Sequence, residues 1–291
     1  MQVVIWSGLT LGAIYALVAI GFTLTLVPTG VFNFAEGAIV VAGSFLAYQW
    51  FHAVGMALGP ALLLNALCGA VLGTLCEVLA IRPLRWRAGT VSSNAIVTTV
   101  GASTALIGLI GVEWGYYPLL VPFHGPTRFL HALGAVEAPV EVIVVASAIV
   151  VALALHFWFR LSRTGRACLA VSEDREAAML RGVNVSAMSL AAFAVAGAFG
   201  AVVGLITGPI TYAIPTLGTS LALGGFVALA LGGEGSFLGA LAGGLLVGLV
   251  SSFATRYLGA NYSEIAVLVV LLLTLAARPA GLGGVAEARR V

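Results

Sequence analysis

The sequence predicts an all-α polytopic membrane protein with about eight transmembrane helices, one or two of which are broken or re-entrant. Of its 291 residues, 61% are hydrophobic and only 8% are charged, whereas about a quarter of the residues in a soluble domain are charged. The mean hydropathy is +1.12. Apolar runs recur along the whole chain, and a bilayer core about 30 Å thick needs roughly 20 apolar residues per helix. We therefore expect residues 1–291 to form a single transmembrane domain.

The apolar runs are bounded by charges, prolines or glycine clusters. They fall at about 3–27, 33–52, 58–81, 95–112, 140–159, 187–207, 217–231, 238–255 and 262–277. Two of them follow helix-breaking sequences, PTG at 28–30 and GGEG at 232–235. Non-helical backbone at membrane depth persists only where protein or a water-filled cavity satisfies its polar groups. These two segments are the ones we expect to be interrupted, and the glycines of 232–248 predict close approach between helices.

The arginines predict the orientation of the chain in the membrane. All 13 basic residues are arginine, and eleven lie at 82–87, at 160–181 or in the tail at 278–290. The alternation of spans places these three regions on one side, and the positive-inside rule makes that side the cytoplasm. We expect a cytoplasmic C-terminus, a cytoplasmic loop at about 160–186 and an outer loop at about 113–140. The side of the N-terminus depends on whether both early runs cross fully, and both options stay open.

The composition also excludes several classes of function. A phosphate-binding loop needs a lysine, and the chain has none, so any ATP that drives this protein must bind another subunit. The net charge of +2 is too small and scattered for nucleic-acid binding. The cysteines, Cys68, Cys76 and Cys168, form neither a disulfide framework nor a metal-ligand spacing, and the histidines form no metal pair. We expect no bound metal or cofactor and no bond-making chemistry in this chain.

The cytoplasmic loop contains a short helix with its own end signals. Ser172 is the expected cap, and Gly182 ends the helix before Ser186 caps the next span. Three acidic residues favour the positive end of the helix dipole: Glu173, Asp174 and Glu176. A short, independently capped helix between two spans is typical of a docking element.

Glu176-Ala177-Ala178 followed by Gly182 resembles the E-A-A-x-x-x-G signature with which importer permeases of the ATP-binding-cassette class engage their ATPases. The segments at 8–48, 163–206, 232–248 and 277–284 are similar to the H-type permease of the high-affinity branched-chain amino acid import family. They cover about half the chain, in the same order as in the family. The resemblance implies a permease domain that couples to its ATPases through the following residues: Glu173, Asp174, Glu176, Ala177, Ala178 and Gly182.

The same resemblance implies an assembly in the bacterial inner membrane. Its members are a second related permease, two ATPase subunits that use ATP and magnesium, and a periplasmic solute-binding protein that delivers an amino acid. Relatives in the family carry branched-chain amino acids, other amino acids, and urea or short amides. The solute therefore stays open at this point.

Candidate pathway residues lie in the two interrupted segments, at Asn33, Glu36 and Gly37 and at Glu234 and Gly235. Glu36 replaces the histidine of the family's N-F-A-H-G pattern, and Glu234 replaces an aliphatic residue. Ionisable groups at membrane depth usually face a cavity or pore. Equally, both carboxylates could be solvated at the cytoplasmic headgroup level.

Thr98 and Thr99 are weaker candidates, because threonine in a membrane helix more often bonds its own backbone. Glu77 is either a buried relay group or an interfacial residue with a partner. The main alternative to an importer is an ion-coupled secondary transporter or channel, for which Glu77, Glu36 and Glu234 are the only plausible coupling groups. An intramembrane enzyme is a further alternative that no catalytic arrangement of residues favours.

Overall fold

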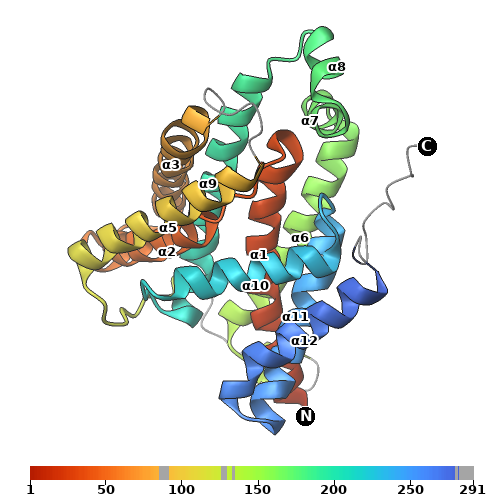
Figure 1. The fold of residues 1–291 in the computed structure, drawn as a ribbon. Coiled ribbons are helices and arrows are strands. Elements are labelled where there is room, and N and C mark those ends of the chain that lie inside the picture. The colour runs from red at the N-terminus through yellow and green to blue at the C-terminus, as the bar shows by residue number, and fades with distance from the viewer. Residues whose placement is uncertain (85–91, 126–129, 133–134, 279–280, 282–291) are drawn as a thin grey trace. The chain divides into compact units, whose positions relative to one another are not determined.

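The computed structural model describes residues 1–84, 92–125, 130–132, 135–278 and 281. Arg85, Arg87, Arg128, Arg289 and Arg290, and the end of the 277–284 motif, lie outside these residues. The described chain is built of helices, as Figure 1 shows. Six are long and apolar enough to cross a membrane: Gln2–Thr29, Leu58–Leu84, Asn94–Trp114, Pro139–Leu161, Val185–Thr211 and Phe237–Tyr257. Two shorter apolar helices, Leu217–Gly232 and Ser263–Ala276, bring the number to eight. The predicted all-α membrane fold is confirmed.

The first half of the chain runs through α1 (Gln2–Thr29), α2 (Glu36–Tyr48), α3 (Leu58–Cys76) and α5 (Ser92–Trp114). Two π-helical turns extend these helices: η1 (Gln49–Ala53) follows α2, and η2 (Glu77–Ile81) follows α3. Such turns are rare and occur often at functional sites. The loop at about 113–140 carries a short antiparallel hairpin of β1 (Leu130–Ala132) and β2 (Ala135–Glu137), in which Leu130 pairs with Glu137.

The second half begins with α6 (Pro139–Leu161), followed by the short helices α7 (Arg163–Glu173) and α8 (Arg175–Leu180). It continues through α9 (Val185–Thr211), α10 (Leu217–Gly232), α11 (Phe237–Tyr257), η3 (Ala260–Tyr262) and α12 (Ser263–Ala277). The cap of α9 is Asn184, whose side chain accepts a hydrogen bond from the Ala187 N–H at 3.0 Å. The prediction that Ser186 caps this span is therefore wrong, because the helix begins one residue before it.

The chain forms two compact units, each assembled from separate segments. One contains Met1–Thr23, Pro126–His156 and Leu223–Val291, and the other contains Leu24–Gly125 and Phe157–Ala222. We call them unit 1 and unit 2 and describe each by itself.

In unit 2, α9 packs against both α2 and α3. Glycines permit this contact: a β-carbon on Gly73 would collide with the carbonyl of Phe193, and one on Gly204 with that of Val40. Asn65 of α3 is fully buried and donates hydrogen bonds from Nδ2 to carbonyls of both other helices, at 3.0 Å to α2 and 2.8 Å to α9. A buried amide with satisfied donors fixes the relative placement of the three helices.

In unit 1, α1 and α11 run antiparallel in close contact. A β-carbon on Gly12 would lie 2.8 Å from the carbonyl of Gly244, and one on Gly8 would lie 3.0 Å from the Cα of Leu249. The close helix approach predicted from the glycines of 232–248 is confirmed. At the far end of α11, the hydroxyls of Ser251 and Ser263 lie 2.7 Å apart and join α11 to α12.

Candidate functional site

The chain is interrupted between α1 and α2, as the PTG sequence predicts. Helix α1 ends at Thr29, and Gly30 follows in the left-handed region with φ of 68°. Thr29 Oγ1 accepts a hydrogen bond from the Val31 N–H at 3.1 Å, which turns the backbone away from the helix axis. Residues 31–35 are non-helical and largely buried before α2 begins at Glu36. The break therefore lies inside the protein.

Asn33 lies in this break and is fully buried. Its Oδ1 accepts hydrogen bonds from the Ala35 N–H at 3.3 Å and from the Cys76 thiol at 3.4 Å. Among the residues that the structure describes, the Asn33 Nδ2 group has no hydrogen-bond partner. Burying an amide donor without a partner costs about 1–3 kcal/mol. Asn33 therefore holds an unused donor beside the broken backbone.

Glu36 is the first residue of α2 and is also completely buried. Neither carboxyl oxygen has a hydrogen-bond partner within the described chain. The Oε1 atom lies against α9, at 2.6 Å from where a β-carbon on Gly200 would be. The next residue, Gly37, packs on the carbonyl of Gly218 and so serves close helix contact. The interruption thus buries an unpaired carboxyl group beside an unpaired amide donor.

Glu77 and Ser189 form a second buried polar contact in the same unit. Glu77 begins the π-helical turn η2, and its Oε1 accepts a hydrogen bond from the Ser189 hydroxyl of α9 at 3.2 Å. Glu77 is thus buried, as the first interpretation of this residue expects, and it has a partner, as the second expects. Because Glu77 follows Cys76, which bonds Asn33, this contact adjoins the interruption.

The two threonine candidates differ. Thr99 is buried, and its hydroxyl lies 3.3 Å from the carbonyl of Phe32 in the interruption as well as near carbonyls of its own helix. Thr98 bonds only to α5 backbone carbonyls in the described structure, at 3.2 Å to Asn94 and 3.1 Å to Ala95. Thr99 therefore joins the polar cluster around the break, and Thr98 does not. We call Asn33, Glu36 and Thr99 the buried polar cluster.

The second predicted interruption is a turn between α10 and α11. Gly233 and Gly235 adopt φ of 93° and 80°, and Ser236 caps α11 by accepting the Gly239 N–H at 3.0 Å. Glu234 and Gly235 are exposed. Both residues belong to unit 1. A solvated carboxylate at a helix end is the simpler of the two interpretations given for Glu234.

The loop at about 160–186 holds two short helices where the sequence predicts one. Ser162 caps α7 by accepting the Gly165 N–H at 2.8 Å. Asp174 caps α8 by accepting the N–H groups of Glu176 and Ala177, both at 3.0 Å. The prediction of Ser172 as the cap is wrong, because Ser172 lies in the last turn of α7 and bonds a carbonyl of that helix. Glu173 is the last residue of α7.

Gly182 ends α8, as predicted. It adopts φ of 86°, its N–H donates to the Met179 carbonyl at 2.9 Å, and the Val183 N–H donates to the Ala178 carbonyl at 3.1 Å. This is the usual glycine-terminated helix end.

Helix α8 has an anchored side and an exposed side. Ala178 is buried with Val171 of α7 and Val185 of α9. In contrast, Leu180 is 90% exposed and Met179 is 49% exposed. Sequence reasoning missed these two residues, although large apolar side chains in a polar loop are a usable signal of a contact surface.

Residues 4–277 match the family described as "Branched-chain amino acid transport system / permease component". The chain belongs to this family. The resemblance inferred from the sequence motifs is therefore confirmed, and the chain is a permease component of the importer class to which the family belongs.

Curated relatives agree over nearly the full length. The chain is 30% identical over 299 residues to the "High-affinity branched-chain amino acid transport system permease protein LivH" of Escherichia coli (strain K12), covering 98% of this chain and 96% of the relative. It is 29% identical to the corresponding BraD protein of Pseudomonas aeruginosa, with the same coverage. A "Fructose import permease protein FrcC" of Rhizobium meliloti is 28% identical over 91% of this chain and 74% of its own length. Permeases named for different solutes are thus similar to this chain.

Proposed function

We propose that this chain is the transmembrane permease subunit of an ATP-binding-cassette importer for branched-chain or related amino acids. It works in the bacterial inner membrane with a second related permease, two ATPase subunits and a periplasmic solute-binding protein. The observation that carries the proposal is α8, a capped helix with an exposed apolar side in a family of transport permeases. ATP and magnesium belong to the partner subunits.

The predicted ATPase-coupling residues have two roles: some of them form and anchor α8, and others are exposed on its surface. Asp174 caps the helix, Gly182 ends it, and Ala178 anchors it to α7 and α9. Glu176 faces outward and is exposed. Fully burying a leucine or methionine side chain contributes about 1.5–3 kcal/mol. An ATPase subunit that covers Met179 and Leu180 gains this free energy, so these two side chains are the apolar centre of the contact.

Helix α8 is connected to the buried polar cluster through α9. Its anchor, Ala178, packs with Val185 in the first turn of α9. The same helix then contacts Glu77 through Ser189 and Glu36 at Gly200. ATP and the loaded binding protein must favour different conformations, since a ligand with equal affinity for both shifts nothing. Helix α9 transmits that preference from the ATPase contact to the interruption.

The buried polar cluster is suited to the backbone groups of an amino acid. The Asn33 Nδ2 donor matches a carboxylate, and the Glu36 carboxylate matches an ammonium group. Broken helices at membrane depth are where transporters hold charged substrate groups. We therefore assign Asn33, Glu36 and Thr99 to the solute pathway and leave Thr98, Glu234 and Gly235 outside it.

Contacts within single helices and within unit 1 support an orientation. Trp6 Nε1 donates to Glu141 Oε2 at 2.8 Å, so the starts of α1 and α6 lie at the same end. Helix α6 ends at Leu161, with Arg160 in its last turn at the start of the arginine-rich loop, which the positive-inside rule places in the cytoplasm. The N-terminus is then periplasmic. Gly281 lies against Gly233 at the start of α11, the end away from Trp6, which makes the C-terminus cytoplasmic.

Reconstitution tests the proposal. The chain is placed in proteoliposomes with its partner permease and binding protein, with or without the ATPase subunits, and uptake of labelled leucine, fructose and urea is measured. We expect leucine uptake that requires the ATPase and ATP. Uptake without the ATPase that collapses with an uncoupler would establish the ion-coupled alternative. ATP-dependent uptake of fructose or urea but not leucine would support the importer assignment and contradict the proposal that the solute is an amino acid.

A further inference from the structure

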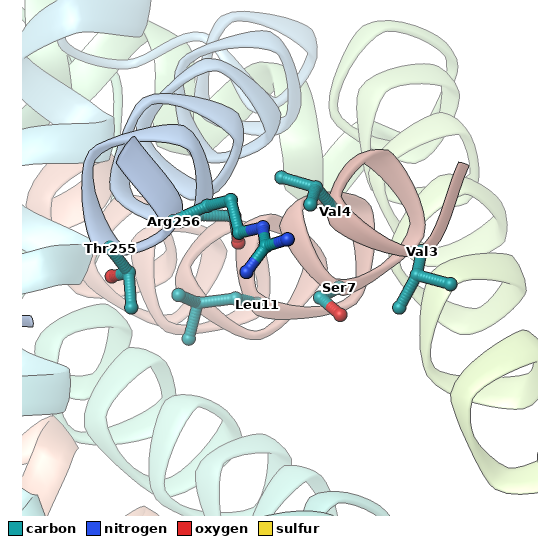
Figure 2. A pocket seen from close by; sticks show the side chains of 7 residues that line it. Val3, Val4, Ser7, Leu11, Thr255 and Arg256 are labelled. Atoms are coloured by element: carbon teal, nitrogen blue, oxygen red, sulfur yellow. The ribbon is translucent and has the colours of Figure 1, made fainter. Parts of the chain in front are cut away.

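Unit 1 contains an open groove that the transport proposal does not use. The groove has a volume of about 600 Å³ and lies between the first turns of α1 and the last turns of α11. Helix α1 contributes Val3, Val4, Ser7 and Leu11 to its lining, and α11 contributes Ser252 and Arg256 among others. Figure 2 shows the Arg256 side chain reaching from α11 toward Val4 and Ser7. A cation therefore projects into a groove with hydroxyl and apolar walls.

Arg256 is exposed, and it has no hydrogen-bond or ion-pair partner among the residues that the structure describes. Glu141, the acidic residue bonded at the start of α1, is engaged by the indole of Trp6. Arg256 offsets the partial negative charge at the C-terminal end of α11, and the N-terminal end of α1 carries partial positive charge. An anion between Arg256 and the first turns of α1 is attracted by both. The local charge therefore favours an anionic ligand.

The apolar walls identify the kind of anion. Val3 is 67% exposed, and Leu11 lies two turns deeper along α1 than Val4. At 1.5 Å per residue, the lining extends about 10 Å along the helix axis. Helix α1 is long and apolar enough to cross a membrane, so this direction leads from the helix end toward the hydrocarbon core. An apolar wall does not stabilise free phosphate, but it can pack against the acyl chain of a lipid.

We propose that this groove binds the phosphate group of a membrane phospholipid. Arg256 pairs with the phosphodiester, for which its planar fork is well matched. The hydroxyls of Ser7 and Ser252 lie in the same groove and donate to the phosphate oxygens. One acyl chain lies along Val3, Val4 and Leu11. The site is separate from the buried polar cluster, so it holds a structural lipid and not the transported solute.

The test is titration of phosphatidylglycerol into the detergent-purified full chain, with bound lipid counted by native mass spectrometry. Arg256→Ala should weaken retention of one phospholipid by at least about tenfold, because a hydrogen bond to a charged group contributes about 1.5–3 kcal/mol. Phospholipid retention by Arg256→Lys should lie between that of the wild type and that of Arg256→Ala, since lysine keeps the positive charge but lacks the planar guanidinium group. Arg278→Ala, which removes an exposed arginine at the other end of unit 1, is the matched control and should retain lipid normally.

A second variant and a second probe separate the possible ligands. Leu11→Trp fills the apolar wall and leaves Arg256 in place, so it should reduce phospholipid retention while the chain elutes as a folded species. Inorganic phosphate at millimolar concentration should not displace the lipid. The proposal is overturned if Arg256→Ala and Arg278→Ala retain lipid equally, or if phosphate binds alone and is insensitive to Leu11→Trp. Loss of binding-protein association by Arg256→Ala with unchanged lipid retention also overturns it and assigns the groove to a protein partner.

Discussion

Replacing Gly182 with valine should weaken ATPase binding without impairing membrane insertion. Gly182 ends α8 with φ of 86°, and no atom lies within 4 Å of the position of an added β-carbon. The substitution therefore creates no collision, and its cost is the left-handed backbone alone, about 1–2 kcal/mol for a residue other than glycine. This cost is relieved if the end of α8 unwinds, which removes Leu180 from its exposed position. ATPase affinity should fall by roughly five- to thirtyfold.

The assay is a binding titration of the purified ATPase subunit against the detergent-solubilised chain, alongside the yield of inserted protein. Gly115→Val is the matched control: Gly115 lies in the same unit, has φ of 81° and also has open space at its β-carbon position. It should insert normally and bind the ATPase with wild-type affinity. Gly182→Asn should be milder, since asparagine tolerates this conformation better. Wild-type affinity for Gly182→Val, or an equal loss for Gly115→Val, would refute the reasoning.

Four further outcomes are expected. Asp174→Ala should destabilise α8 by about 1 kcal/mol and speed amide hydrogen exchange across residues 175–180, while Asp174→Asn, which can still cap, should not; equal exchange in both variants would contradict the capping role. Asn65→Leu should lower the thermal unfolding midpoint, because two buried carbonyls lose their donor at about 1–3 kcal/mol, and an unchanged midpoint would show that the amide is not needed. Glu36→His should change solute preference in the uptake assay without loss of assembly, and unaltered specificity would remove Glu36 from the pathway. Burial raises the pKa of the Cys168 thiol, so less thiolate is present at neutral pH and maleimide should label it more slowly than an exposed cysteine; equal rates would contradict this.

Local signals in the sequence were sufficient to predict the helix breaks and the close helix contacts. The PTG sequence predicted the interruption after α1, and Gly182 was correctly placed at the end of α8. The cap of α8 was not predictable in the same way. Ser172 and Asp174 are both good N-cap residues two positions apart, and the choice depends on where α7 ends. Ala178 of α8 packs with Val171 of α7 where the two helices adjoin, and periodicity does not reveal this contact.

The candidate site was predictable only in part for the same reason. Asn33 and Glu36 lie three residues apart in the sequence, so the prediction of one interrupted segment made both of them candidate pathway residues. Their surroundings come from distant segments: Cys76 bonds Asn33, and Gly200 makes room for the Glu36 carboxyl group. Such partners are chosen by helix packing over more than forty residues, and no spacing rule identifies them from one sequence.

The glycine contacts among α2, α3 and α9 limit how this protein can change shape. Where Gly73 meets the Phe193 carbonyl and Gly204 meets the Val40 carbonyl, main chain lies directly on main chain. No flexible side chain is available there to absorb a small slip, and Asn65 bonds across the same contact. We therefore expect these three helices to move together as one rigid body. We therefore expect the torsional changes of a transport cycle to fall outside this contact, at the non-helical stretches 30–35 and 212–216 that lead into α2 and α10.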